Sequence, residues 1–192
     1  MGGNNRYKYI LWDHDGVLVD TEKYYFRATQ KAMAEFGVKL SDSTYLEYMA
    51  LGKSCWTLIR NMGVSEQDIR VKKEQRNEYY RHYLQTEDIE IDHVLTTLKQ
   101  LSANYRMAIV TTSRRRDFQL IHEKRSITSF MDFVLDIEDY EHAKPHPDPY
   151  MTALNRFGAK PSEAVVIEDT SRGLASAIAA GIDCLVLNNP FT

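Results

Sequence analysis

The sequence predicts an α/β protein with a Rossmann-like parallel sheet core and an inserted α-helical domain. Two observations support this prediction. Short apolar runs alternate with segments of helical periodicity, and most of the runs are continuously apolar, as in strands that are covered on both faces. Between residues 19 and 85 the alternation stops, and no convincing strand occurs. Strands that alternate with helices favour an open parallel sheet with right-handed crossovers.

The elements follow in chain order. Runs of strand type are bounded by turn residues, and the helical segments between them end at glycine or at polar clusters. The predicted strands are Tyr9–Trp12, Met107–Thr111, Phe133–Leu135, Ala164–Ile167 and Cys184–Leu187. The helices expected between the later strands are Arg115–Lys124, Pro149–Phe157 and Gly173–Ala180, the last closed by Gly181.

The interval without strands is predicted to form a separate helical lobe. We expect an α/β core of residues 1–18 and 86–192 and a helical domain of residues 19–85. Each predicted helix of this lobe is amphipathic, so the lobe has an apolar side to bury. These helices are Glu22–Phe36, Ser43–Ala50, Cys55–Met62 and Glu66–Leu84.

The composition argues against several classes of protein. The net charge of -3 gives no strong field for nucleic acid or an anionic membrane. No window approaches the ~18 apolar residues of a spanning helix, and residues 1–6 lack the apolar core of a signal peptide. We therefore expect a cytoplasmic protein with no nucleic-acid or membrane partner, a monomeric state, and free thiols at Cys55 and Cys184.

The first predicted strand ends in Asp13-His14-Asp15-Gly16. Asp13 and Asp15 are two residues apart, so in an extended chain both side chains face the same side. Carboxylates this close repel each other unless a cation lies between them or one keeps its proton. The pattern indicates a divalent-metal site or a nucleophile beside a general acid; the alternative is a surface turn. By strand alternation His14 points away from both aspartates, which favours packing over catalysis.

Polar residues also follow the second and fourth predicted strands. Thr111 and Thr112 precede a helix, where hydroxyls and backbone amides bind an anion or simply cap the helix. Glu168 and Asp169 offer carboxylates that suit Mg²⁺, with helix capping as the alternative. Ligands of open α/β sheets bind beyond the carboxyl ends of the strands, so these residues are expected near the aspartate pair.

Lys144 begins the run Lys144-Pro-His-Pro-Asp-Pro149. The prolines favour an extended, rigid segment, which would present Lys144 to a site rich in carboxylates. The alternative is a solvent-exposed lysine. We expect no zinc site from the histidines, and His146 between two prolines is expected to be structural or exposed.

The order D-x-D-G, T-T-S, K-P and E-D-x-x-x-G resembles the four motifs of the haloacid dehalogenase superfamily over almost the whole chain. The segments Asp15–Glu22, Lys144–Tyr150 and Val166–Leu174 are similar to its helical-cap branch. This branch includes phosphoglycolate-phosphatase-like and β-phosphoglucomutase-like enzymes. The slot of His14 often holds Phe, Leu or Met in this family. The resemblance implies that residues 19–85 form the cap.

The resemblance also implies an activity, that of a phosphatase. A Mg²⁺-dependent phosphatase would hydrolyse a small phosphorylated metabolite, a phosphomonoester, through an aspartyl-phosphate. Asp13 would be the nucleophile, and Asp15 the general acid and then the general base. Lys144 would neutralise charge on Asp13 and the phosphoryl group. The implied Mg²⁺ ligands are Asp13, the backbone carbonyl of Asp15, Asp169 and Glu168, and the implied phosphate ligands are Thr111 and Thr112.

Two alternatives stay open. A phosphomutase of the β-phosphoglucomutase type would use the same aspartates but return the phosphoryl group to a sugar. The four motifs do not separate it from a phosphatase, because that choice lies in the cap. A catalytically silent binding module is the other alternative, although the intact motifs argue against it. In the cap, Lys53 of the loop Ala50–Ser54 is either a substrate contact or a solvated lysine.

Overall fold

The computed structural model describes residues 6–189. These residues form two compact units, one of residues 6–20 and 90–189 and the other of residues 21–89. The domain boundaries expected from the sequence, after residues 18 and 85, lie two and four residues before the observed boundaries after residues 20 and 89. The expectation that residues 1–6 form no signal peptide falls mostly on residues 1–5, which lie outside the described residues. Within 6–189 no helix combines the length and the apolar character that crossing a membrane requires.

The first unit contains a five-stranded parallel sheet with the order β3-β2-β1-β4-β5. In register, Trp12 of the central strand lies beside Ile109 and Ile167. The chain therefore leaves β1, β2 and β4 at the same edge of the sheet. The predicted α/β fold is confirmed. The strands are β1 Tyr9–Trp12, β2 Arg106–Val110, β3 Phe133–Leu135, β4 Ala164–Glu168 and β5 Asp183–Val186.

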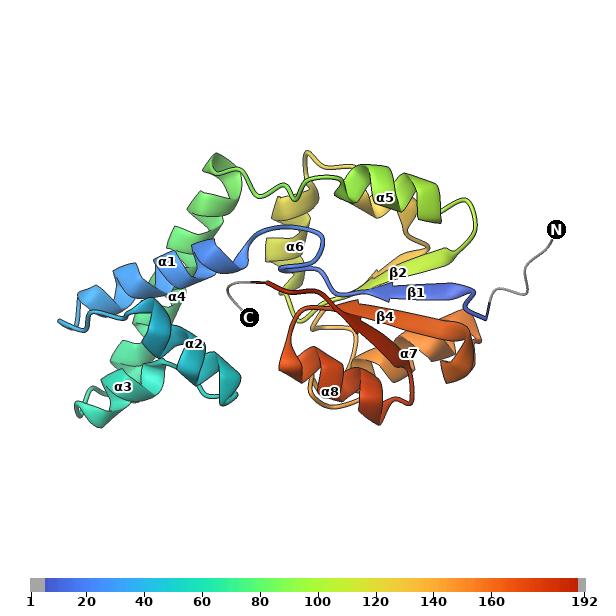
Figure 1. Ribbon diagram of the computed structural model, residues 1–192. Coiled ribbons are helices and arrows are strands. Elements are labelled where there is room, and N and C mark those ends of the chain that lie inside the picture. The colour runs from blue at the N-terminus through green and yellow to red at the C-terminus, as the bar shows by residue number, and fades with distance from the viewer. Residues whose placement is uncertain (1–5, 190–192) are drawn as a thin grey trace. The chain divides into compact units, whose positions relative to one another are not determined.

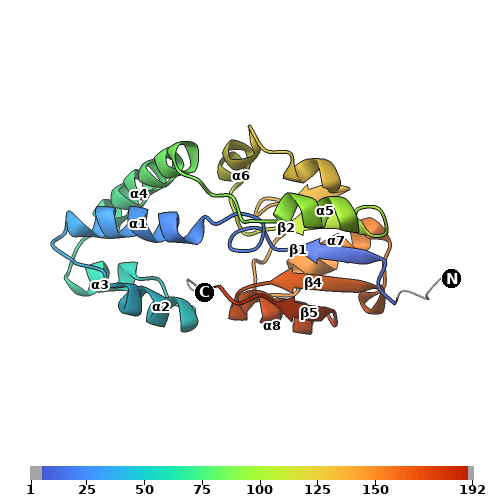
Figure 2. The ribbon, with the colours of Figure 1, turned by 45° about the horizontal axis from the view of Figure 1, so that its top comes forward.

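Helices cover both faces of this sheet, α5 and α6 on one face and α7 and α8 on the other (Figures 1 and 2). Leu11 and Val166 share a buried cluster with Tyr150 and Leu154 of α7, which fixes that face. The helix α5 is absent from the helices predicted above, because its β-branched residues weaken the helical pattern. The bounds are α5 Val94–Leu101, α6 Arg115–His122, α7 Asp148–Phe157, α8 Ser171–Ala179, and the short 3₁₀ helices η1 Ile127–Phe130 and η2 Pro161–Glu163.

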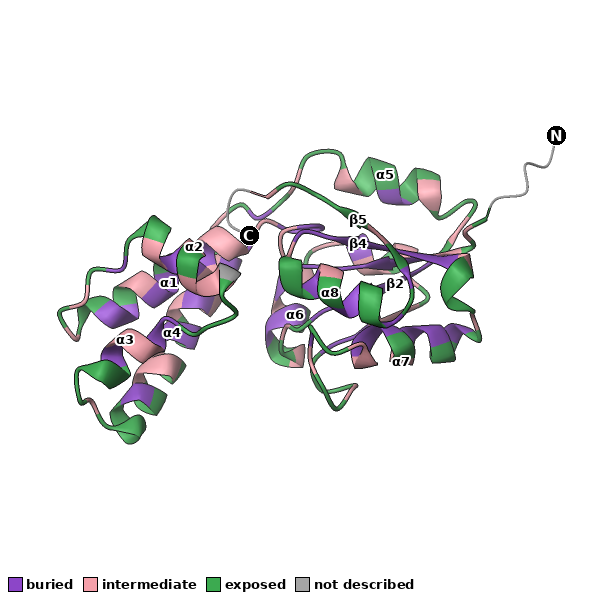
Figure 3. Cartoon of the chain, turned by 60° about the horizontal axis from the view of Figure 1, so that its bottom comes forward, coloured by how far each residue is buried: buried purple, intermediate pink, exposed green. Residues whose placement is uncertain are grey.

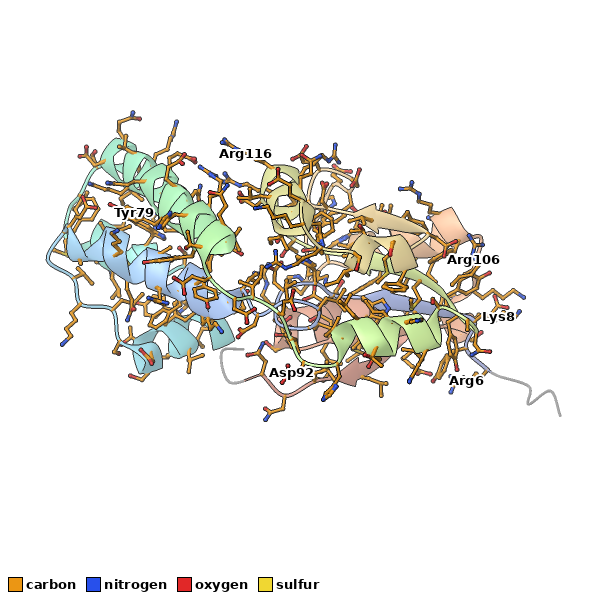
Figure 4. All side chains as sticks on the ribbon, turned by 90° about the horizontal axis from the view of Figure 1, so that it is seen from above. Arg6, Lys8, Tyr79, Asp92, Arg106 and Arg116 are labelled. Atoms are coloured by element: carbon orange, nitrogen blue, oxygen red, sulfur yellow. The ribbon has the colours of Figure 1, made fainter. Side chains whose placement is uncertain are left out.

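The two ends of the strands differ in character. At the amino edge, Arg6, Lys8 and Arg106 (Figure 4) form ion pairs with carboxylates of the same unit. The interior strands are mostly buried, whereas the edge strand β5 is largely exposed (Figure 3). Leu185 of β5, for example, is 59% exposed. Surface ion pairs of this kind contribute little to stability, so the buried strands dominate it.

The second unit is a helical lobe that encloses its own apolar core. Ser41 and Ser65 start two of its helices by accepting the backbone N–H of Thr44 and Asp68, each at 3.1 Å. Tyr79 of α4 (Figure 4) donates a hydrogen bond to Glu35 at 3.2 Å. Its helices are α1 Glu22–Ala34, α2 Asp42–Ala50, α3 Trp56–Asn61 and α4 Glu66–Thr86. The buried core residues are Phe26, Ala32, Met33, Leu40, Tyr45, Cys55, Trp56, Ile59 and Ile69.

Leu11→Ala tests the central strand, because Leu11 is fully buried between β2 and β4. We expect it to lower the free energy of unfolding by about 2–5 kcal/mol, since it removes buried methyl groups and leaves a cavity. Leu95→Ala is the control, because Leu95 is 43% exposed and should cost far less. Urea denaturation followed by circular dichroism measures both, and equal losses would contradict this packing.

Candidate functional site

The backbone of the sheet brings the predicted site residues to one edge. The N–H of Asp13 donates to the carbonyl of Ile167 at 2.8 Å, so pairing with β4 continues one residue past β1. The N–H of Thr111 donates to the carbonyl of Leu135 at 2.9 Å in the same way. Glu168 is the last residue of β4. The side chains of these residues therefore start from neighbouring strand ends.

Lys144 lies at the centre of this edge. Its Nζ is 2.6 Å from Oδ1 of Asp13 and 2.7 Å from Oε1 of Glu168, and it donates to the carbonyl of Val110 at 2.9 Å. These contacts use all three donors of an ammonium group. Lys144 is only 4% exposed, so the alternative of a solvent-exposed lysine is excluded. Arg172 donates to the carbonyl of Lys144, and the Lys144–Pro145 peptide bond is cis.

Burial and charge act in opposite directions on these groups. Burial disfavours the charged ammonium of Lys144, but the negative charges of Asp13 and Glu168 outweigh it and hold the pKa of Lys144 above its usual range. Burial raises the pKa of Asp13, and the carboxylates of Glu168 and Asp169 add to this rise, although Lys144 opposes it. One lysine thus balances only part of the negative charge of three buried carboxylates.

Glu168 uses both carboxylate oxygens. Oε1 accepts from Lys144 and from the hydroxyl of Tyr150, at 2.7 and 3.0 Å. Oε2 accepts from the backbone N–H of Asp169 and from both the N–H and the hydroxyl of Thr170, at 3.0 to 3.1 Å. These donors and Lys144 lower the pKa of Glu168 in spite of its burial. Glu168 therefore orients Lys144 from inside the fold.

Two glycines leave the space that the carboxylates of Glu168 and Asp169 occupy. A Cβ on Gly173 would lie 1.7 Å from Oε1 of Glu168. A Cβ on Gly16 would lie 2.0 Å from Oδ2 of Asp169, and Gly16 has φ of +82°, a conformation that other residues rarely adopt. Only glycine fits these positions without moving a carboxylate.

The donor set fits a hard divalent cation. One carboxylate oxygen from each of Asp13, Glu168 and Asp169 lies within 4.8 Å of the others. Asn189 donates to Oδ2 of Asp169 at 3.0 Å and to the carbonyl of Gly16 at 3.3 Å, which holds the loop after β1 against the end of β4. Carboxylate oxygens are the ligands that Mg²⁺ prefers, and a 2+ charge would balance the surplus of buried negative charge.

Asp15 is turned toward the loop after β2. Its Oδ2 accepts from the hydroxyl of Ser113 at 2.6 Å and from that of Thr111 at 3.3 Å. Thr111 is buried, whereas Thr112 is exposed, so the structure brings only Thr111 to the carboxylates. Ser113 has no role in the sequence-based site, although it belongs to the same T-T-S segment.

The expected orientation of His14 is wrong with respect to Asp15. Strand alternation places its ring away from Asp15, yet its Nδ1 lies 3.2 Å from Oδ2 of Asp15. The reason is that β1 ends at Trp12, so alternation no longer applies at residues 13–15. The ring is fully buried, as packing predicts, but it also meets the carboxylate.

Two other predictions concern residues outside this cluster. Lys53 is exposed in the loop between α2 and α3 of the helical lobe, so its role as a substrate contact stays a prediction. His142 and His146 are four residues apart, a metal-ligand spacing that the sequence analysis overlooks. With Asp148 they form a mostly exposed group whose ligand atoms lie within 4.8 Å of one another. Nδ1 of His146 already accepts the N–H of Asp148 at 3.2 Å.

Comparison with known proteins identifies the family of the chain. The sequence profile of haloacid dehalogenase-like hydrolases matches residues 10–187. The chain is 24% identical to the fructose-1-phosphate phosphatase YqaB of Escherichia coli K12, over 94% of this chain and 96% of that protein. It is also 24% identical to the pyrophosphatase PpaX of Oceanobacillus iheyensis, over 90% and 79% of the two chains.

A solved structure shares the fold. The crystal structure of a predicted phosphoglycolate phosphatase from Haemophilus somnus superposes with a TM-score of 0.82. It is 22% identical and covers 97% of this chain and 86% of that one. The parallel α/β core and four strand-end motifs define a hydrolase of the haloacid dehalogenase type. The chain belongs to the haloacid dehalogenase-like hydrolase family, which confirms the expected membership and enzyme class.

Gly173→Ala tests the close approach of Glu168 to α8. Helix propensity alone would stabilise the protein by about 1 kcal/mol. We expect instead a loss of about 1–3 kcal/mol, because the new methyl group displaces the Glu168 carboxylate. Ala175→Gly, an exposed position of the same helix, measures propensity alone and should lose about 1 kcal/mol. Thermal unfolding measures both variants. A Gly173→Ala protein that is more stable than the wild type would contradict the close approach of Glu168 to α8.

Proposed function

We propose that the protein is a Mg²⁺-dependent phosphatase that hydrolyses a small phosphomonoester through an aspartyl-phosphate at Asp13. The observation that carries this proposal is the contact of Lys144 with Asp13 and Glu168 at the end of the central strands. It places a carboxylate with one engaged oxygen beside a buried positive charge. The phosphatases YqaB and PpaX, to which the chain is similar, support the reaction class.

In the first step, the second carboxylate oxygen of Asp13 attacks phosphorus while the bond to the leaving oxygen breaks. Asp15 gives its proton to that oxygen, so an alcohol leaves and Asp15 becomes a carboxylate. Lys144 favours the ionised form of Asp13 and orients it through Oδ1. Its charge also offsets the negative charge that gathers on the phosphoryl oxygens.

In the second step, Asp15 takes a proton from water, and the water oxygen attacks phosphorus. The bond between phosphorus and Asp13 breaks, which releases inorganic phosphate and restores the Asp13 carboxylate. Asp15 regains the proton that it gave away, so one cycle consumes one ester and one water. We assign Thr111 to the phosphoryl oxygens through its hydroxyl, and Thr112 through its backbone amide.

Asp13, Asp169 and the backbone carbonyl of Asp15 would hold Mg²⁺. The ion would supply positive charge against the phosphoryl oxygens and the surplus of carboxylates. Glu168 stays in the proposed ligand set, but its oxygens already accept five hydrogen bonds from protein groups. Its main proposed role is therefore to orient Lys144.

The proposed substrate is a small phosphorylated metabolite, in line with the sugar phosphate that the name of YqaB gives. We propose that residues 19–85 act as the cap, with Lys53 as a substrate contact. A cytoplasmic monomer without nucleic-acid or membrane partners completes the proposal. A phosphomutase is the second candidate, because the same aspartates serve both reactions.

Asp13→Asn tests the nucleophile, because it keeps the shape of the side chain but removes the charge. We expect hydrolysis of p-nitrophenyl phosphate to fall by about a thousandfold or more, since no other group takes over the attack. Excess EDTA should abolish wild-type activity, and added Mg²⁺ should restore it. Activity that survives either change would reject the aspartyl-phosphate mechanism.

Incubation with β-glucose 1-phosphate separates the two candidate reactions. A phosphatase releases inorganic phosphate and glucose, whereas a mutase accumulates glucose 6-phosphate. We expect only inorganic phosphate in ³¹P NMR spectra, because water is the proposed acceptor. Accumulation of glucose 6-phosphate would replace the phosphatase proposal with the mutase.

A further inference from the structure

Two histidines form a buried chain behind Asp15. His14 lies between Asp15 and His122 of α6, with its Nδ1 3.2 Å from Oδ2 of Asp15 and its Nε2 2.8 Å from Nε2 of His122. The ring of Phe118 flanks both imidazoles, at 4.8 and 4.4 Å between ring centroids. His14 has no exposed surface. The ring of His14 therefore meets the partly buried carboxylate of Asp15 from inside the fold.

The short distance between the histidines restricts their protons. Two imidazole nitrogens 2.8 Å apart share one hydrogen, so one donates and the other accepts. Oδ2 of Asp15 already accepts hydrogen bonds from Ser113 and Thr111. A third hydrogen-bond donor would therefore interact favourably with Oδ2, whereas an unprotonated ring nitrogen would be repelled by it. With one proton on each ring, the consistent arrangement has His122 donate to Nε2 of His14, so that His14 carries its proton on Nδ1 and donates to Asp15.

His122 is suited to hold this arrangement. Burial and the neighbouring His14 lower the pKa of His122 to about 3, so its ring stays neutral near neutral pH. Within the described residues, its other nitrogen, Nδ1, is buried without a hydrogen-bond partner. Burying such a group is unfavourable. Packing alone would be served better by an apolar side chain, which the slot of His14 often holds in the family.

We propose that His14 is a positioning residue for Asp15, and that His122 fixes the tautomer of His14 that donates to the carboxylate. This inference rests on the proposed function, in which Asp15 exchanges a proton with the leaving oxygen and with water. Hydrogen bonds from His14, Ser113 and Thr111 to Oδ2 orient the carboxyl group that exchanges this proton. The effect should be greatest where the leaving oxygen depends most on that proton.

Three variants of His14 separate orientation from packing. In His14→Asn the amide nitrogen takes the place of Nδ1, whereas His14→Gln places its amide nitrogen near Nε2 and His14→Leu has no donor. With an alkyl phosphate, we expect kcat/KM to fall about tenfold or more for Leu and Gln. KM should stay within about twofold, and Asn should recover most of the loss. With p-nitrophenyl phosphate, whose leaving group needs little protonation, the losses should be smaller.

The His14 variants should rank differently in thermal stability than in activity. By packing, Leu should be tolerated better than the smaller and more polar Asn, so thermal unfolding should rank Leu above Asn while activity ranks Asn above Leu. An activity order that follows stability, or equal losses for both substrates, would overturn the proposal. Wild-type activity in His14→Leu would overturn it as well.

His122→Phe is the second test and keeps an aromatic ring on α6. It removes the donor to His14, and we expect a smaller loss with the same dependence on the leaving group. Ile121→Val, a buried position of the same helix, controls for loosened packing and should affect both substrates equally. No loss, or an equal loss for both substrates, in His122→Phe would reject its role. Full activity in Asp13→Asn would instead reject the proposed function itself.

Discussion

The buried ammonium group of Lys144 is the contact on which the rest of the site depends. It joins the end of β1 through Asp13, the end of β2 through the carbonyl of Val110, and the end of β4 through Glu168. Without it, mutually repelling carboxylates would meet in a medium of low polarity. Removing one partner of such a buried pair is far more destabilising than the pair itself is stabilising. The lysine therefore offsets part of the cost of burying the proposed nucleophile.

The geometry around Lys144 constrains residues that have no chemical role. Gly173 leaves the space that Glu168 fills, and Gly16 leaves the space beside Asp169. Tyr150 reaches from α7 to the same oxygen of Glu168 that Lys144 contacts. The packing of the helices on the sheet therefore also positions the charged groups of the site. The α7 helix both covers the sheet and completes the environment of its central charge.

Much of the fold and of the cluster follows from the sequence. All five strands differ by at most one residue at each end from the predicted ranges, and the predicted Met107–Thr111 and Cys184–Leu187 are each shifted along the chain by one residue. Buried parallel strands have a strong apolar signal. The motifs pointed to Asp13 and Glu168 at strand ends and to Lys144 in the adjoining loop, and the structure brings the three side chains together. The helix α5 was missed because β-branched residues obscure its pattern.

The parts that the sequence did not predict depend on contacts between distant segments. His14 contacts His122 across more than a hundred residues, and Asn189, the last described residue, contacts Asp169. Neither pairing has a local pattern. Ser113 was visible in the T-T-S segment but carried no signal by itself, whereas the H-x-x-x-H spacing of His142 and His146 was a signal that was overlooked. Strand alternation failed for His14 because β1 ends at Trp12.

The most direct test of the account is the identity of the phosphorylated side chain. In Asp15→Asn the second step should be slow, while p-nitrophenyl phosphate needs little acid help to react in the first step. Acid quenching during turnover, followed by peptide mass spectrometry, would locate the trapped phosphoryl group. The account predicts about one nitrophenolate released per enzyme in a burst, with the phosphoryl group on Asp13. A phosphoryl group on another side chain, or a burst that persists when Asp13 is also replaced by Asn, would contradict it.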